Sequence, residues 1–318
     1  MDDLVSASVT GDKFAIARLI SVFESIRSED QQRCADLERQ LSAASRKTGL
    51  LVGLTGAPGA GKSTLIQFLV DALLELKTDW RIAVVAVDPS SPISGGSLLG
   101  DRTRVNFGDN DRTYFRSQAS DLDLGGIGRN TFRVCRVLRR IFDLVLVESV
   151  GVGQSEIEIG RLADVTLLAL QPFSGDHIQF MKSGIMEIPQ AFVITKCDAE
   201  DLAQRSLYQL QSSLDFMQRA VGPSGTDSSA PAPQIFQTSS IRNTGFAELA
   251  EFVSHAQPLG ALQDADRENY FLKKEIRYHF GEVGLKKANA QLPGAEHPGF
   301  EARRLHLLDR LFREAGLL

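Results

Sequence analysis

Residues that build disulfide frameworks and metal centres are scarce in this chain of 318 residues. It contains three cysteines and five histidines. Cys34, Cys135 and Cys197 lie far apart and form no C-x-x-C pair, so we expect neither a disulfide framework nor a cysteine metal site. We interpret the three cysteines as small apolar residues that are buried in a protein of the reducing cytosol.

Long apolar runs and an excess of positive charge are also missing. No run approaches the roughly 20 apolar residues that cross a bilayer, and the start Met-Asp-Asp-Leu lacks the basic residues of a signal peptide. The net charge of −5 argues against a general nucleic-acid surface, because such surfaces need clustered Lys and Arg. The sequence therefore predicts a cytoplasmic protein whose partners are neither nucleic acid nor membrane.

A phosphate-binding loop is the strongest motif that the chain does contain. Residues 56–63, G-A-P-G-A-G-K-S, match G-x-x-x-x-G-K-[ST] and follow an apolar run at 50–54. Glycines let backbone N–H groups turn toward a phosphate, Lys62 neutralises the β and γ phosphates, and the Ser63 hydroxyl is placed to bind Mg²⁺. We assign nucleotide binding to Gly56, Ala57, Gly59, Ala60, Gly61, Lys62 and Ser63.

The pattern around this loop predicts the fold class. Leu65, Leu69, Leu73 and Leu76 recur at helical spacing, which predicts a helix with one buried stripe. Further apolar runs rich in β-branched residues alternate with helical patterns, and such runs are typical of strands buried on both faces. We expect an α/β fold with a doubly wound, mostly parallel sheet and the ligand at the carboxyl ends of the strands. These runs are 82–87, 144–147, 165–170 and 191–194.

Helical segments are predicted on both sides of the nucleotide domain. Ile16, Leu19, Ile20 and Phe23 follow a helical period after Asp12, which can cap the helix. Apolar stripes on charged helices near the carboxyl end are typical of self-association or partner docking. The predicted organisation is an N-terminal helical extension at 1–47, a nucleotide domain at 48–256 and a C-terminal helical arm at 257–318.

Carboxylates near the predicted strand ends are candidate ligands of Mg²⁺, which prefers hard oxygens. Asp88 and Glu148 each end a predicted strand, and Asp101 follows a Gly/Ser-rich loop. Gly151 would let a backbone N–H meet the γ-phosphate, and Gln154 would position a water. A simple turn at Asp88-Pro89 and a surface position for Gln154 are the alternatives.

Residues 195–198, T-K-C-D, are a variant of the guanine motif N-K-x-D. Asp198 can accept two hydrogen bonds from the ring N–H and the exocyclic amine of guanine, while the Lys196 stem covers the base. Thr195 in place of Asn forfeits a neutral hydrogen bond of roughly 0.5–1.5 kcal/mol, so guanine preference should survive. Residues 239–241 follow another short apolar run and can supply contacts to the base edge. They are Ser239, Ser240 and Ile241.

Several segments together resemble the MeaB/ArgK/MMAA family of G-protein metallochaperones over roughly residues 5–256. Besides the phosphate loop and T-K-C-D, they are V-D-P-S-S, G-G-S-x-x-G-D, L-V-E-S-V-G-V-G-Q-S-E and K-S-G-I-M-E-I. The resemblance implies a Ras-like core of the SIMIBI class and a C-terminal dimerisation arm, hence a homodimer. It also implies GTP and Mg²⁺ binding, slow hydrolysis, and gating of cofactor loading or protection of an adenosylcobalamin-dependent acyl-CoA mutase. That mutase would be of the methylmalonyl, isobutyryl or hydroxyisobutyryl type.

The same resemblance adds residue roles. It implies a phosphate contact from Thr64 and a third switch, linked to partner-stimulated hydrolysis, at Asp176, Gln179 and Lys182. The sequence departs from the family at Thr195, at His177, where an acidic residue is common, and at 172–174, P-F-S.

Three other functions share the phosphate loop. A kinase for a small molecule or a protein would need an acceptor pocket and an arginine-bearing lid, and would leave T-K-C-D without a purpose. A GTPase chaperone for a nickel enzyme would need thiolates or imidazoles at ligand spacing, which the five histidines do not show. A binding module without hydrolysis differs only in turnover.

Overall fold

The computed structural model describes most of the chain and divides it into two compact units. The described residues are 3–45, 47–88, 110–119, 127–149, 155–172, 188–221, 232–289 and 299–316. One unit comprises Met1–Leu50, Gly128–Val145 and Pro258–Leu318, and the other comprises Leu51–Ile127 and Leu146–Gln257. None of the helices in the described part is long and apolar enough to span a bilayer.

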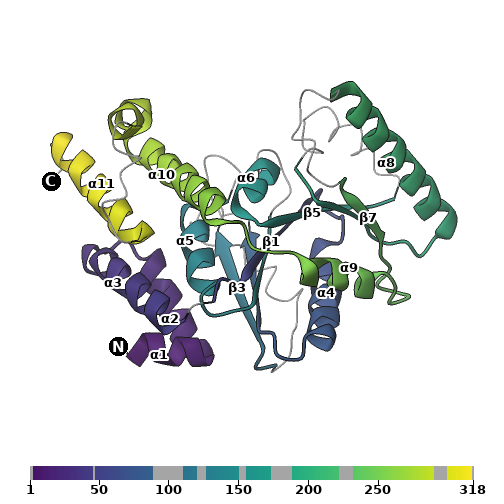
Figure 1. Cartoon of the computed structure of the whole chain (residues 1–318), viewed down its shortest axis with the longest axis horizontal. Helices are drawn as coiled ribbons and strands as arrows, with labels where there is room; N and C mark the ends of the chain where they lie inside the picture. Colours follow the sequence, from purple (N-terminus) through teal and green to yellow (C-terminus); the bar gives the residue numbers. More distant parts are fainter. Residues whose placement is uncertain are drawn as a thin grey trace. The chain divides into compact units, whose positions relative to one another are not determined.

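A seven-stranded parallel sheet with flanking helices forms the frame of the second unit (Figure 1). Its strand order is β3-β2-β4-β1-β5-β6-β7. The strands are β1 (Leu50–Gly56), β2 (Ile82–Asp88), β3 (Thr113–Ala119), β4 (Leu144–Glu148), β5 (Val165–Leu170), β6 (Ala191–Ile194) and β7 (Gln234–Gln237). The predicted fold class is confirmed. Because β1 is central, the loop that follows it lies at the carboxyl edge where parallel-sheet ligands bind.

Helices of this unit pack on the sheet and on one another through apolar residues. The helices are α4 (Lys62–Leu76), α6 (Ser155–Leu162), α8 (Glu200–Val221) and α9 (Phe246–His255). Helices α4 and α9 lie side by side (Figure 1), and the Phe68 and Phe246 rings stack with centroids 4.8 Å apart. The predicted stripe on α4 is buried at Leu65, Leu69 and Leu73, but it is wrong at Leu76, which is 48% exposed in the last turn.

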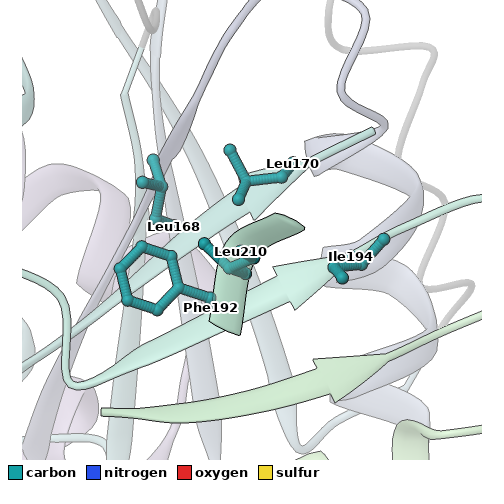
Figure 2. Packing of buried hydrophobic residues seen from close by; sticks show 5 residues of the cluster. All are labelled: Leu168, Leu170, Phe192, Ile194 and Leu210. Carbon is teal, nitrogen blue, oxygen red and sulfur yellow. The ribbon is translucent and has the colours of Figure 1, made fainter. Parts of the chain in front are cut away.

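One apolar cluster lies beneath the nucleotide motifs. Figure 2 shows its buried side chains, which come from β5, β6 and α8. They are Leu168, Leu170, Phe192, Ile194 and Leu210. Ala57 of the phosphate loop and Cys197 of the T-K-C-D segment pack against the same cluster. Both motifs therefore pack on the same apolar core, and the close packing of protein interiors makes such a core rigid.

The first unit is helical. Its helices are α1 (Asp3–Thr10), α2 (Lys13–Glu24), α3 (Ser28–Ala44), α5 (Arg129–Leu138), α10 (Ala261–Asn289) and α11 (Phe300–Glu314). The predicted cap is confirmed, because the Asp12 carboxylate accepts hydrogen bonds from the N–H groups of Phe14 and Ala15. The predicted stripe from Ile16 to Phe23 is buried. Helix α10 bends at Gly281, whose φ of 61° and ψ of −160° suit only glycine.

Arginines of α5 hold the helices of the first unit together. The Arg133 guanidinium donates to both Glu301 carboxylate oxygens at 2.7 and 2.9 Å and to Cys34 Sγ at 3.2 Å. Arg136 pairs with Glu38 and Glu268, and these partners come from α3 and α10. Burial raises the pKa of the Cys34 thiol to about 11. Segments far apart in the chain thus form one unit through paired charges, some buried and some partly buried, and paired charges are the kind that interiors tolerate.

Candidate nucleotide site

The phosphate loop joins β1 to the N-terminus of α4. Gly59 and Gly61 have φ values of 81° and 79°, which glycine adopts without steric cost. Gly56 is required for another reason: a Cβ atom there would lie 2.2 Å from the Ala169 carbonyl oxygen of the neighbouring strand. The loop therefore leads directly into the positive end of a helix, an arrangement that suits an anion.

Lys62 lies in the first turn of α4 and is 8% exposed. Its Nζ donates hydrogen bonds to the carbonyl oxygens of Gly56 at 2.8 Å and Ala57 at 3.2 Å. The ammonium group is thereby held against the loop itself. A lysine ammonium group held in this position suits the predicted contact with phosphate better than it suits an ion pair at the solvent-exposed surface.

Ser63 and Glu148 form the candidate metal corner of the site. The Ser63 hydroxyl lies 3.1 Å from Oε1 and 3.4 Å from Oε2 of Glu148, which ends β4. A hydroxyl and a carboxylate are hard oxygen donors, and this pair fits Mg²⁺. Asp88 ends β2, the neighbour of β4 in the sheet, but its side chain lies outside the described part, as does all of Asp101.

The T-K-C-D segment follows β6 and contacts the phosphate loop. Lys196 has a φ of 54°, and its Nζ donates to the Gly59 carbonyl oxygen at 2.7 Å and to Gln171 Oε1 at 3.1 Å. The Thr195 hydroxyl is buried and lies 2.7 Å from the Ala60 carbonyl oxygen. The phosphate loop and the T-K-C-D segment are more than 130 residues apart in sequence, yet they are hydrogen-bonded to each other.

Asp198 is oriented by the segment that follows β7. The buried Ser239 hydroxyl donates to Asp198 Oδ1 and accepts a hydrogen bond from the Arg242 backbone N–H at 3.1 Å. The Arg242 guanidinium also donates to the Asp198 backbone carbonyl at 2.6 Å. Ser239 thus acts on the carboxylate, whereas Ile241, predicted beside it as a base-edge contact, has an 81% exposed side chain.

A pocket lies between the start of α4 and the two segments after β6 and β7. Its lining residues are Gly61, Thr64, Leu65, Thr195, Lys196, Thr238, Ser240 and Phe246. Sequence reasoning missed Phe246 and the Gly245 that precedes it. Gly245 has a φ of 81°, and a Cβ atom there would lie 1.9 Å from the Gln237 carbonyl oxygen. In the sequence, this turn is indicated only by the run Asn-Thr-Gly. That run does not show that the following residue, Phe246, lines a pocket.

The family of the chain follows from comparison with known proteins. A family model described as methylmalonyl Co-A mutase-associated GTPase MeaB matches residues 16–277. The chain belongs to the MeaB family. A protein of Pyrococcus abyssi that is named as a GTPase is 36% identical over 302 residues, which cover 93% of this chain and 89% of that protein. The mitochondrial methylmalonic aciduria type A homolog of Mus musculus is 33% identical over 262 residues, covering 78% of this chain and 61% of that protein.

A solved structure supports the fold of this MeaB-family chain. The structure described as LAO/AO transport system kinase has a TM-score of 0.61 and 20% identity, and the match covers 99% of this chain and 97% of that one. The chain has the fold of a phosphate-loop GTPase, and membership of this GTPase family implies guanine-nucleotide and Mg²⁺ binding. Five residues assigned by sequence or resemblance, Gly151, Gln154, Asp176, Gln179 and Lys182, lie outside the described part.

The described part of the structure gives little support to the alternative function of a GTPase chaperone for a nickel enzyme. Within the described ranges, no three His, Cys, Asp or Glu side chains come together as metal ligands. Burial raises the pKa of Cys197 to about 11 and that of Cys135 to about 12. Burial therefore disfavours the thiolate, which is the form of cysteine that binds a metal.

Proposed function

We propose that the chain binds GTP and GDP with Mg²⁺ and hydrolyses GTP. The observation that carries the proposal is the orientation of Asp198. Ser239 donates to one oxygen of the Asp198 carboxylate and so orients it, and this carboxylate would accept hydrogen bonds from the ring N–H and the amine of guanine. Adenine offers no such donor pair. Lys196, Ser239, Ser240 and Ile241 complete the proposed base site.

The proposed chemistry divides the work between the loop and the end of β4. Lys62 and the N–H groups at the start of α4 stabilise negative charge on the phosphates. Ser63 and Glu148, with Asp88 and Asp101, would hold Mg²⁺, which supplies further positive charge when bound. Gln154 would orient the attacking water, and the Gly151 N–H would meet the γ-phosphate. Asp176 and Lys182 would act in the form of the site that a partner stimulates.

The nucleotide cycle is proposed to gate cofactor loading or protection of an adenosylcobalamin-dependent acyl-CoA mutase. The names of the family and of the mouse relative support this partner. The cobalamin would belong to the mutase rather than to this chain. We further propose a homodimer that uses the C-terminal arm, and a cytoplasmic location.

The base assignment is tested by calorimetry with GTP, GDP, ATP and XTP. The unaltered protein should bind GTP far more tightly than ATP. Asp198→Asn should shift preference toward XTP, because xanthine carries a carbonyl where guanine carries an amine. Equal affinity of the unaltered protein for ATP and GTP would contradict the proposal.

The gate is tested by GTPase rates with and without candidate mutases. Mutase should raise turnover by ordering catalytic groups. Asp176→Ala and Lys182→Ala should lower the stimulated rate much more than the basal rate, whereas Asp201→Ala, an exposed position on α8, should change neither. Absence of stimulation by every mutase, or equal loss of both rates, would contradict the gate.

A further inference from the structure

Arg242 lies two residues after Ser240, which lines the pocket, but its side chain contacts the segment that follows β6. Its Nη2 atom donates to the Asp198 backbone carbonyl at 2.6 Å, and its Nη1 atom donates to Glu200 Oε1 at 2.6 Å. Glu200 lies in the first turn of α8. The guanidinium group therefore bridges the aspartate that is predicted to read the base and the helix that follows it.

The turn that contains Arg242 is fixed by its own backbone. Ser239 and Thr244 exchange two backbone hydrogen bonds, each of 3.1 Å. Asn243 has a φ of 51°, in the left-handed region that asparagine adopts more readily than most residues. The Arg242 backbone N–H donates to Ser239 Oγ at 3.1 Å. Replacing the Arg242 side chain with that of alanine would therefore remove the guanidinium contacts and keep this backbone contact.

The backbone on either side of Asp198 is held in different ways. Before it, the Cys197 backbone N–H donates to a carbonyl of the segment after β7 at 3.0 Å. After it, residues 199–200 are exposed, so burial does not fix the chain there. The Arg242 guanidinium holds the Asp198 carbonyl on this exposed side, and a hydrogen bond from a charged donor is stronger than a neutral one.

The bond to the carbonyl, rather than the ion pair, has a consequence for base reading. The Arg242 and Glu200 side chains are 46% and 77% exposed, and ion pairs this exposed contribute little. The Asp198 carboxylate would accept hydrogen bonds from two donors of guanine, and hydrogen bonds weaken steeply as their angle falls. A rotation of the Asp198 backbone would therefore weaken guanine binding in particular.

We propose that Arg242 is a positioning residue that determines guanine specificity through Asp198. Its guanidinium group holds the Asp198 backbone so that the carboxylate faces both donors of the base. The inference rests on the proposed nucleotide function. Its consequence depends on the base: loss of the guanidinium group should weaken a ligand more, the more hydrogen bonds that ligand makes to Asp198.

The test compares GDP with IDP, whose base lacks the exocyclic amine, by calorimetry on the full-length protein. The unaltered protein should prefer GDP, because a site built to bond a donor binds an analogue without it more weakly. Arg242→Ala should weaken GDP roughly two- to tenfold and IDP less, so that the preference for GDP falls. Loss of positive charge alone would weaken both diphosphates by the same factor and leave their ratio unchanged.

Two single variants are the controls. Glu200→Ala removes the ion pair and keeps the bond to the Asp198 carbonyl, and Arg205→Ala removes a positive charge from an exposed position on α8. Both should keep the GDP/IDP ratio of the unaltered protein. In an Asp198→Ala background, which has no carboxylate to position, Arg242→Ala should leave the ratio as it is. A merely structural role would instead lower affinity in both backgrounds.

A second readout needs no nucleotide. Hydrogen exchange of the amides of residues 198–201 should be faster in the free Arg242→Ala protein and normal in Arg205→Ala, because only the first variant releases the Asp198 carbonyl. If Arg242→Ala does not fold, Arg242→Gln, whose side chain is shorter than that of arginine, is measured in its place.

The outcomes separate this inference from the proposed function. An unchanged GDP/IDP ratio in Arg242→Ala overturns the positioning role. An equal fall of the ratio in Glu200→Ala also overturns it, because the ion pair would then carry the effect. If the unaltered protein binds neither diphosphate, or binds both equally well, the proposed reading of guanine fails, and hydrogen exchange alone then decides whether Arg242 holds the Asp198 backbone.

Discussion

Glu301 offers the sharpest test of what holds the helical unit together. Its carboxylate lies on α11 and accepts two hydrogen bonds from Arg133 of α5, at 2.7 and 2.9 Å. The two side chains are 3% and 2% exposed. Arg133 also donates to the Phe23 backbone carbonyl, at the end of α2. Glu301→Gln would keep the shape of the side chain and remove its charge, leaving the buried guanidinium without its hydrogen-bonded counter-ion.

The expected loss of folding free energy is large because the ion pair is buried away from water. Removing one partner of a buried ion pair costs about 3–5 kcal/mol, since the other charge stays desolvated. Arg304 enlarges the penalty, as its guanidinium is 7% exposed and lies 3.5 Å from Glu301 Oε2. Arg304 retains Glu275 as a partner at 2.7 Å, so most of the cost arises at Arg133. We expect the free energy of unfolding to fall by about 3–5 kcal/mol.

Urea denaturation followed by circular dichroism measures this loss. Asp309→Asn is the matched control on the same helix: Asp309 pairs with Arg313 at 2.8 Å, but the two side chains are 44% and 71% exposed. Exposed pairs contribute about 0–1 kcal/mol, so this variant should unfold almost like the unaltered protein. If Glu301→Gln loses no more stability than Asp309→Asn, the reasoning about the buried pair is refuted.

Two further changes test the nucleotide unit. Lys62→Ala should weaken GTP and GDP ten- to hundredfold or more by calorimetry, because a charge-assisted contact of roughly 1.5–3 kcal/mol is lost. Unchanged GTP affinity would contradict the loop assignment. Gly245→Ala should lower the free energy of unfolding by about 2 kcal/mol or more, through its φ of 81° and a clash with the Gln237 carbonyl. Gly316→Ala, where φ is 70° and a Cβ atom meets nothing within 4 Å, should cost clearly less; equal losses would show that the clash contributes nothing.

Local patterns were enough to predict the parallel sheet and the phosphate loop. Strands β1, β2, β4, β5 and β6 are apolar runs buried on both faces, and such runs have few alternatives in a chain of this length. The loop follows from residue chemistry alone, because glycines, a lysine and a hydroxyl are specified at fixed spacing. The cap at Asp12 and the stripe after it are equally local.

Elements with weak local patterns were missed. Strand β3 reads T-Y-F-R-S-Q-A, and as an edge strand it pairs with β2 alone, so it tolerates polar residues that a central strand would not. Helix α5 and the residue that follows it carry arginines that suggest a solvated surface, yet Arg133 and Arg139 are buried. Their carboxylate partners come from α10 and α11, and no sequence window contains both sides of such a pair.

The sequence by itself predicted the chemistry of the site: which residues would bind phosphate, which carboxylate would read guanine, and which strands would deliver them. The tertiary structure decided how those residues act on one another. Thr195 looked like a weakened base contact in the motif T-K-C-D, but its hydroxyl lies on the Ala60 carbonyl. Folding brings β6 to the loop after β1, and a hydrogen bond depends on position in space, which spacing along the chain does not contain.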